Sequence, residues 1–341
     1  MKIGIHHREG SFSKYWIEYC ESRNIPWKRI DCYKSDVMSQ LSDCDAFMWH
    51  HFHISPKDTL FAKQLLYSVE MSGRAVYPDF RSNWHFDDKL GQKYLLEAVN
   101  APMASSYAFF SKHDALEWIA NTTFPKVFKL RGGSGSDNVK LVKTKREARV
   151  LVNRAFGKGF RIFNAYTGLK ERLRQYKKGK ADLNEVFKGI VRFFIPTPYS
   201  IVHGRERGYI YFQDFIPDNT HDIRVTYVFN RCFALRRNVR PGDFRASGSG
   251  MIDYDMSMIP EEALKIAFSV ANRLKLQCAA FDFVLHNGRP LIAEVSYGFG
   301  YDEDQFNHGY WDEDLDYHPG TFNPYAWMVD GIVFSVKDTD D

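Results

Sequence analysis

A stretch near the C-terminal end, residues 281–296, constrains the fold more than any other part of the chain. Two apolar, β-favouring runs flank an Asn287-Gly288 turn signal, and this pattern predicts a β-hairpin. Each run carries one acid, Asp282 or Glu294, at a position where a core residue is expected. A buried carboxylate is costly unless it is paired or binds a metal, so the two acids indicate a candidate metal site.

The two acids would lie on one face of the sheet only if an odd number of residues connects the strands. We therefore expect the connection Asn287-Gly288-Arg289. Ser296, two residues beyond Glu294, would then point the same way because side chains alternate along a strand. Such an oxygen-rich patch suits a hard cation such as Mg²⁺, whereas the alternative is an edge hairpin with solvated acids.

The composition suits a soluble globular protein of two or three subdomains, since 44% of the 341 residues are hydrophobic and 26% are charged. No apolar run approaches the roughly 18 residues that span a membrane, and the N-terminus lacks the apolar core of a signal peptide. The cysteines are odd in number and show no CxxC spacing, which favours reduced thiols in a cytoplasmic protein over a zinc site. A net charge of +4, with no recognised binding motif, argues against a nucleic-acid partner.

Short strands alternate with helices over residues 1–85, which predicts a small α/β unit with a parallel sheet. We expect strands at 2–5, 26–30, 46–49 and 75–77 and helices at 13–22 and 59–71. The segment His50-His51-Phe52-His53 follows the third strand. Ligands of open α/β sheets bind beyond the carboxyl ends of strands, so this cluster is a candidate substrate contact. Histidines on a surface loop are the alternative.

A glycine-rich loop follows a short strand that ends near Lys129, and a second strand begins at Val139. Glycines let backbone amides approach phosphate oxygens, and the lysine supplies a positive charge for them. The loop has neither the ending of a P-loop nor the spacing of a dinucleotide fingerprint, and an ordinary turn is the alternative.

The remaining chain predicts further strands at 209–217, 222–228 and 231–238, helices at 90–99, 145–156 and 260–274, and an apolar C-terminal segment at 322–336 that packs back onto the fold. A basic segment runs from Lys170 to Lys180. Such a run is either a solvated helix face or a platform for an anionic substrate.

The order of these motifs resembles the ATP-grasp superfamily of carboxylate–amine ligases, and within it the ribosomal-protein glutamate ligases. The resemblance covers residues 86–300 and rests on an ordered set: Asp88-Lys89 opening a helix, Lys129 with its glycine loop, Gln213 to Ile216 at a strand end, Asp222 to Val225, Gly242-Asp243-Phe244-Arg245, and the hairpin with Asp282 and Glu294.

The resemblance implies an α/β and α+β chain with the ATP-grasp fold. Residues 1–85 would form a pre-ATP-grasp α/β domain. Residues 86–208 would form the small subdomain with the glycine-rich loop and the basic insertion. Residues 209–341 would form the large subdomain with the metal site and the C-terminal tail, and the two subdomains would clasp the nucleotide.

Site residues follow from the resemblance position by position. Lys89, Lys129, Gly132, Gly133, Ser134 and Gly135 would bind the phosphates of ATP. Gln213, Asp214, Phe215 and Ile216 would border the adenine, and Asp218, Asn219 or Asp222 would contact the ribose. Asp282, Glu294 and Ser296 would hold one or two Mg²⁺ ions, with Mn²⁺ as a substitute, and Arg245 and Arg237 would stabilise the transferring γ-phosphoryl group.

Two departures from the family pattern bear on this site. Ser296 stands where the family usually has asparagine, and a hydroxyl is a poorer Mg²⁺ ligand than an amide carbonyl. Ala280 and Phe281 stand where many members have an arginine just before the hairpin aspartate. We expect an arginine from elsewhere, Arg245 above all, to take that place.

The resemblance implies an enzyme that joins a carboxylate to an amine through an acyl phosphate, at the expense of ATP. A kinase of a small alcohol and a nucleotide-binding protein without catalysis are the alternatives. Aromatic residues in the tail (Tyr297, Tyr301, Tyr310, Trp311 and Tyr317) and the basic segment suggest a glycan-linked acid such as a uronic acid. A free amino acid or peptide is the alternative acid. The oligomeric state stays open, with a dimer among the options.

Overall fold

The computed structural model describes residues 1–133, 138–161, 169, 173, 176, 182–191, 201, 202, 204–240, 242–300 and 303–338. Contacts group the chain into two compact units. Unit 1 comprises Met1–Ala104 and Ile216–Asp341, and unit 2 comprises Ser105–Phe215. The predicted boundaries at residues 85 and 208 stay a prediction.

The N-terminal part of unit 1 is a parallel sheet with helices on both faces, as predicted. Its four strands run in the order β2-β1-β3-β4. One face packs on α1 through Ile3 and Trp16, and the other packs on α3 through Phe47 and Leu66. The elements are β1 (Ile3–His6), α1 (Ser13–Ser22), β2 (Trp27–Ile30), α2 (Val37–Gln40), β3 (Ala46–Met48), α3 (Pro56–Glu70), β4 (Ala75–Tyr77), α4 (Phe80–Asn83) and α5 (Lys89–Ala98).

The C-terminal part of unit 1 is a seven-stranded sheet in the order β15-β14-β11-β12-β16-β17, with β13 paired to β12. All of its strand pairs are antiparallel. Helix α11 covers one face over Val225 and Phe281. The elements are β11 (His221–Val228), β12 (Arg231–Asn238), β13 (Ile252–Asp253), the 3-10 helix η1 (Met256–Met258), α11 (Glu261–Leu274), β14 (Cys278–His286), β15 (Arg289–Ser296), the 3-10 helix η2 (Glu303–Asn307), β16 (Tyr310–Asp312), β17 (Tyr317–His318) and α12 (Pro324–Asp338).

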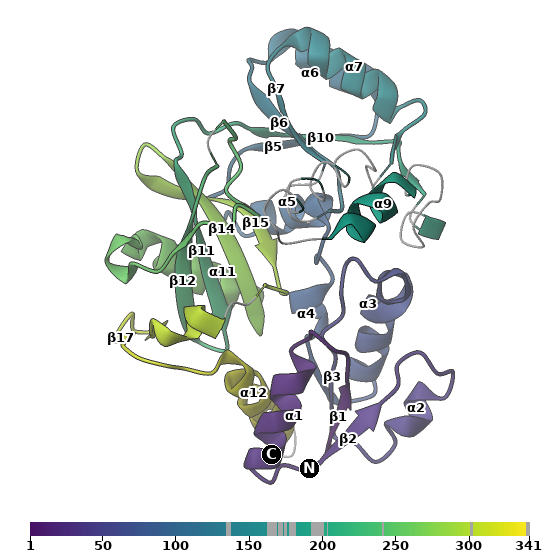
Figure 1. Ribbon diagram of the computed structural model, residues 1–341, viewed down its shortest axis with the longest axis vertical. Helices are drawn as coiled ribbons and strands as arrows, with labels where there is room; N and C mark the ends of the chain where they lie inside the picture. The colour runs from purple at the N-terminus through teal and green to yellow at the C-terminus, as the bar shows by residue number, and fades with distance from the viewer. Residues whose placement is uncertain are drawn as a thin grey trace. The chain divides into compact units, whose positions relative to one another are not determined.

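The predicted apolar C-terminal segment is confirmed as helix α12. Figure 1 shows α12 beside α1, and Met328 and Ile332 are fully buried in the core that α1 and the seven-stranded sheet share. Trp16 of α1 and Phe233 of β12 belong to the same core. Helix α12 therefore fixes the N-terminal α/β part against the sheet within unit 1.

Unit 2 contains a four-stranded antiparallel sheet in the order β5-β10-β6-β7. Helices α6 and α7 pack on one face over Phe128 and Phe212. The elements are β5 (Ser106–Phe109), α6 (Lys112–Asn121), β6 (Lys126–Lys129), β7 (Val139–Val142), α7 (Lys145–Ala155), β8 (Phe160–Arg161), α9 (Leu183–Val191), β9 (Arg205–Glu206) and β10 (Ile210–Asp214). The sequence patterns do not predict β5, α6, β8, α9 or β9.

The hairpin of β14 and β15 differs from the prediction at its turn. His286 pairs with Arg289, so only Asn287 and Gly288 connect the strands, and the expected three-residue connection is wrong. Both turn residues have positive φ, 52° and 79°, as a type I′ turn requires.

A register shift between Asp282 and Phe283 restores the predicted geometry. Phe283 pairs with Ile292 whereas Asp282 pairs with Glu294, so Ala293 is an extra residue in β15. Such a β-bulge changes which side chains oppose each other. It sets the two acids directly opposite each other, on one face of the sheet.

All five cysteines are buried free thiols. Within the described parts of the chain, no helix is long and apolar enough to cross a membrane.

Substitutions in α12 test whether this helix holds unit 1 together. We expect Ile332→Ala to lower the free energy of unfolding by about 2–5 kcal/mol, because it leaves a cavity in the shared core. Phe334 lies on the same helix but is 69% exposed, so Phe334→Ala should change it by less than about 0.5 kcal/mol. Denaturant unfolding measures the free energy of unfolding of both variants. Equal losses for Ile332→Ala and Phe334→Ala would contradict the packing of α12.

Candidate active site

A row of charged side chains occupies the part of the seven-stranded sheet that faces away from α11. Cross-strand pairing places Arg224 of β11 opposite Asp282 of β14, and Asp282 opposite Glu294 of β15. It also places Asp222 of β11 opposite Arg237 of β12. Alternation along the strands then puts all five residues on one face.

Asp282 is held by two arginines. Arg224 donates Nε–H to Oδ1 at 2.7 Å and Nη2–H to Oδ2 at 2.9 Å, which is the two-pronged geometry that guanidinium and carboxylate favour. Arg237 Nη2 lies 2.9 Å from Oδ2 of the same carboxylate. Arg237 also donates two hydrogen bonds to Asp222, both of 2.7 Å.

The two acids that share Arg237 have opposite protonation tendencies. Burial by itself raises the pKa of Asp282, but the positive charges of Arg224 and Arg237 outweigh burial and leave this pKa below its ordinary value. Burial raises the pKa of Asp222, the charge of Arg237 offsets this in part, and the charge of Asp282 raises it further. Asp282 is therefore held in its ionised form more strongly than Asp222.

Glu294 has a lysine beside it. Lys89 Nζ lies 3.4 Å from Glu294 Oε1, and the lysine side chain is buried at the start of α5. Asp88 caps this helix by accepting a hydrogen bond of 3.0 Å from the backbone N–H of Gly91. Sequence reasoning had assigned Lys89 and Glu294 to one site, and the structure brings them together.

The donor set fits Mg²⁺ in number and kind. In the described ranges no group of three or more His, Cys, Asp or Glu side chains gathers as a metal site. Asp282 and Glu294 are two carboxylates on facing strand positions. Mg²⁺ is typically held by one or two carboxylates, with water and substrate phosphates completing the octahedron. Ser296 donates its hydroxyl to the carbonyl oxygen of Gly298 at 2.6 Å.

Arg245 lies in a different arrangement from the one expected. Its guanidinium donates to both carboxylate oxygens of Asp243 in its own loop, at 2.9 and 2.8 Å. The arginines against Asp282 are Arg224 and Arg237, so the expectation that Arg245 takes this place is corrected. Sequence reasoning missed Arg224, although its position two residues after Asp222 puts both side chains on one strand face.

In unit 2, Lys129 and Gln213 share the sheet face that lies away from α6 and α7. Lys129 pairs with Tyr211 and Gln213 with Val127, on the side opposite the packed Phe128 and Phe212. Gln213 donates from Nε2 to the hydroxyl of Ser106 at 3.2 Å. Asp214, which was assigned to the adenine, forms an ion pair of 2.5 Å with Lys126. Phe215 and Ile216 follow β10 and are half-buried. Gly132 and Gly133 of the glycine-rich loop follow β6 and Arg131.

Several predicted contacts fall on residues that the structure does not describe. They are Ser134 and Gly135 of the glycine-rich loop, Tyr301 of the tail, and nearly all of the basic segment 170–180.

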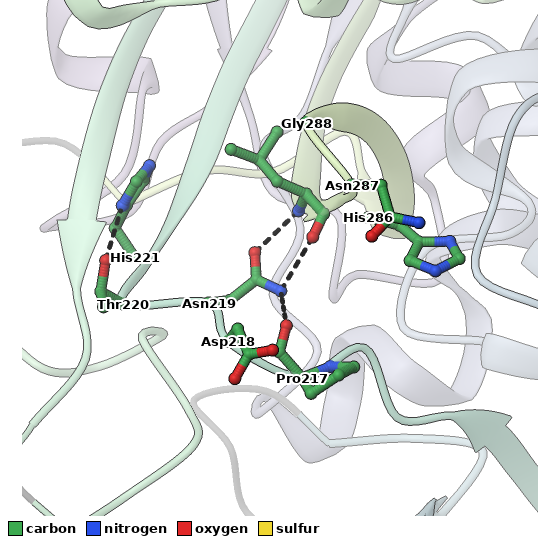
Figure 2. Close-up of a pocket in the computed structure, with 9 residues that line it drawn as sticks. Pro217, Asp218, Asn219, Thr220, His221, His286, Asn287 and Gly288 are labelled. Atoms are coloured by element: carbon green, nitrogen blue, oxygen red, sulfur yellow. Dashed lines mark hydrogen bonds between the residues drawn. The ribbon is translucent and has the colours of Figure 1, made fainter.

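A pocket of about 320 Å³ lies between residues 217–221 and the hairpin tip, residues 285–288 (Figure 2). Asn219 joins its two walls. The side-chain amide of Asn219 donates to the carbonyl oxygens of Ile216, Pro217 and Leu285 and accepts from the Leu285 N–H at 2.7 Å. Of the three candidates for the ribose, Asn219 is thus engaged with backbone and Asp222 with Arg237, while Asp218 is exposed at the pocket.

His50 and His51, which follow β3, are buried, so the alternative that they lie on a surface loop is wrong for these two residues. His51 is 3% exposed, and the His50 ring stacks on Phe12 at 3.6 Å and accepts the Phe12 N–H. Burial, together with the positive charge of Arg8, lowers the pKa of His50 to about 3. Burial also lowers the pKa of His51, so both rings are neutral at physiological pH.

Solved structures with the same architecture are ATP-grasp proteins. A RimK domain protein ATP-grasp from Sphaerobacter thermophilus aligns with a TM-score of 0.57 at 14% identity, over 98% of this chain and 100% of that one. The D-alanine–D-alanine ligase of Bacillus anthracis complexed with ATP aligns with a TM-score of 0.56 at 13% identity, over 99% and 97%. The ATP-grasp ligase PsnB complexed with a minimal precursor, Mg and ADP aligns with a TM-score of 0.53 at 12% identity, over 98% of each chain.

No protein-family model matches this chain. No curated protein sequence matches it either. The structural matches cover nearly the whole chain, and its mixed helices and sheets agree with theirs. The chain has the ATP-grasp fold.

Proposed function

We propose that the protein is an ATP-dependent ligase that joins a carboxylate to an amine. The observation that carries this proposal is the acid pair Asp282 and Glu294, which the bulge at Ala293 sets opposite each other beside Lys89, Arg224 and Arg237. A metal-bound triphosphate needs carboxylates for its metal ion and cations for its phosphate oxygens, and this face of the sheet offers both. The fold, which it shares with ligases that were solved with ATP or with Mg and ADP, supports the same reading.

Each charged residue then has a role. Asp282 and Glu294 would hold Mg²⁺, which neutralises charge on the β- and γ-phosphates when it is bound. Lys89 would bind phosphate in unit 1, and Lys129 with the glycine-rich loop would do so in unit 2. Gln213 to Ile216 would border the adenine, and Asp218 is the ribose candidate whose carboxylate stands exposed at the pocket.

The chemistry needs position and charge stabilisation but no covalent nucleophile from the protein. The substrate carboxylate oxygen attacks the γ-phosphorus, and ADP leaves with the electrons of the broken P–O bond. The amine nitrogen then attacks the acyl carbon, loses a proton, and phosphate leaves. Arg224 and Arg237 stand beside Asp282 and would stabilise the negative charge on the transferring group.

Charge balance explains why nucleotide and metal would bind together. Three acids (Asp222, Asp282 and Glu294) and three cations (Lys89, Arg224 and Arg237) neutralise one another on this face. A metal ion alone would have to displace the arginines from Asp282, and a free nucleotide would draw the same arginines away and leave the acids unpaired. When the metal ion and the nucleotide bind together, the acids can pair with the metal ion and the arginines with the phosphates.

The tail gives little support to a glycan-linked acid. Tyr297 is fully buried and Trp311 lies in the core that α11 covers, so neither is available to stack on a sugar ring, whereas Tyr310 is half-buried and Tyr317 is exposed. This favours the alternative, a small amino acid or a peptide, as the acid substrate.

A substrate screen scored by ADP release tests the proposed reaction. We expect sustained ADP release only when both a carboxylate and an amine are present, because the acyl phosphate occupies the site until the amine consumes it, and a carboxylate alone gives at most about one ADP per enzyme molecule. A carboxylate offered with hydroxylamine in place of the amine should give a hydroxamate, which reports the acyl phosphate directly. ADP release with a simple alcohol and no acid would identify a kinase and overturn the ligase.

Nucleotide affinity tests the role of Lys89. Removing its charge should weaken ATP binding about tenfold and lessen the salt dependence of binding, because one phosphate loses its cation. Lys93→Met is the matched control: it lies one turn further along α5 and pairs with Glu97 at 2.7 Å. Equal ATP affinities for Lys89→Met and Lys93→Met, measured by calorimetry, would exclude Lys89 from the phosphate site.

A further inference from the structure

The parallel sheet of unit 1 has a topological switch point between β1 and β3. Its order, β2-β1-β3-β4, places these two strands side by side, with β2 and β4 on their outer sides. The chain therefore leaves β1 and β3 in opposite directions, and ligands of such sheets bind beyond the carboxyl ends of the strands at such a point. Residues 7–12 and 49–55 form the loops at that position.

Arg8 is the only lysine or arginine in these two loops, and its side chain is oriented by its surroundings. The guanidinium carbon lies 4.2 Å from the centre of the Phe52 ring, a cation–π contact. Nη1 lies 3.8 Å from Oδ2 of Asp58, which is an ion pair but too long for a hydrogen bond.

Asp58 does not depend on Arg8 for hydrogen bonds. Its carboxylate accepts from the hydroxyl of Tyr33 at 2.6 Å, the hydroxyl of Ser55 at 2.6 Å and the backbone N–H of Phe52 at 2.8 Å. The Arg8 guanidinium makes no hydrogen bond to any residue that the structure describes. It is thus held in place, 37% exposed, with its planar set of donors uncommitted.

The two loops are in contact with the segment that follows β15. Tyr297, three residues after Glu294, donates its hydroxyl to the carbonyl oxygen of His51 at 2.7 Å. Phe299 packs on Phe12 with 4.8 Å between ring centres. The chain that carries the candidate metal ligands therefore runs directly against the two loops.

Within the two loops, Arg8 is the residue that can attract an anion. Burial, with the charge of Arg8 as a second cause, holds the pKa of His50 far below its ordinary value, and burial does the same for His51. Neutral histidines add no positive charge. A guanidinium that presents a free planar edge matches a carboxylate better than any other anion of similar size.

We propose that Arg8 binds a carboxylate of a substrate, one that is not the carboxylate activated by ATP. This inference rests on the proposed ligase function and adds a specificity-determining residue to it. The substrate class is a small molecule with an anionic end: a dicarboxylate if the acid substrate carries this group, or an α-amino acid if the amine substrate does.

Calorimetry with defined probes tests the proposal, in the presence of Mg²⁺ and a non-hydrolysable ATP analogue. Glutarate is compared with butyrate, and L-alanine with L-alaninamide, so that each pair differs by one carboxylate. We expect glutarate or L-alanine to bind, and Arg8→Gln to weaken that binding about tenfold or more, the effect of losing a charge-assisted contact. Loss for glutarate assigns the anionic end to the acid substrate, and loss for L-alanine assigns it to the amine.

Arg23→Gln is the matched control, because Arg23 also lies over an aromatic ring, Tyr19, but at the far end of α1. It should bind every probe as the wild type does. Arg8→Lys, which retains the charge but not the planar donors, should fall between wild type and Arg8→Gln, and an unchanged affinity for the ATP analogue shows that both variants are folded.

Equal binding of all carboxylate probes to wild type and Arg8→Gln would overturn the proposal, as would the failure of every carboxylate probe to bind. These outcomes are independent of the ligase assignment, which fails separately if no acid and amine pair releases ADP.

Discussion

One extra residue in β15 sets the geometry on which the candidate active site depends. With a two-residue turn and a regular ladder, Asp282 would oppose Ala293, and Glu294 would point to the other face, into the core beneath α11. The bulge at Ala293 moves Glu294 opposite Asp282 instead. The same shift leaves Ile292 and Val295 in the core, so the hairpin keeps its apolar contacts while it presents two acids.

The rest of the sheet is arranged around that charged face. Helix α11 packs on one side of the sheet, and α12 packs on the other side over the part that holds Phe233 and Ala280. The charged row lies on this second side, and its central residues Asp282 and Arg237 are themselves buried. Within the row, each acid has a cation beside it. Buried ion pairs contribute little net stability, which makes a binding role for these residues the better explanation of the network.

Sequence patterns predicted the elements where one local signal dominates. Helix α1 has the predicted bounds, Ser13–Ser22, and strand β4 has the bounds 75–77. The features that were mispredicted depend on distant parts of the chain. No local residue pattern marks a bulge such as that at Ala293. Without the bulge, the two acids share a face only if an odd number of residues connects the strands, and this condition led to the wrong turn. Arg224 could be assigned to Asp282 only once β11 and β14 were known to be neighbours, and the burial of His50 depends on Phe12 and on the chain after β15.

Electron paramagnetic resonance of Mn²⁺, a spectroscopic substitute for Mg²⁺, tests the central claim that Asp282 and Glu294 hold the metal of a bound nucleotide. Mn²⁺ affinity is measured with a non-hydrolysable ATP analogue for the wild type, Glu294→Gln, Asp282→Asn and, as a control, Asp253→Asn, whose acid pairs with Arg236 on the same sheet. We expect Glu294→Gln and Asp282→Asn to lose at least about tenfold in Mn²⁺ affinity and the Asp253→Asn control to lose none. Equal Mn²⁺ affinity in all four proteins would contradict this claim.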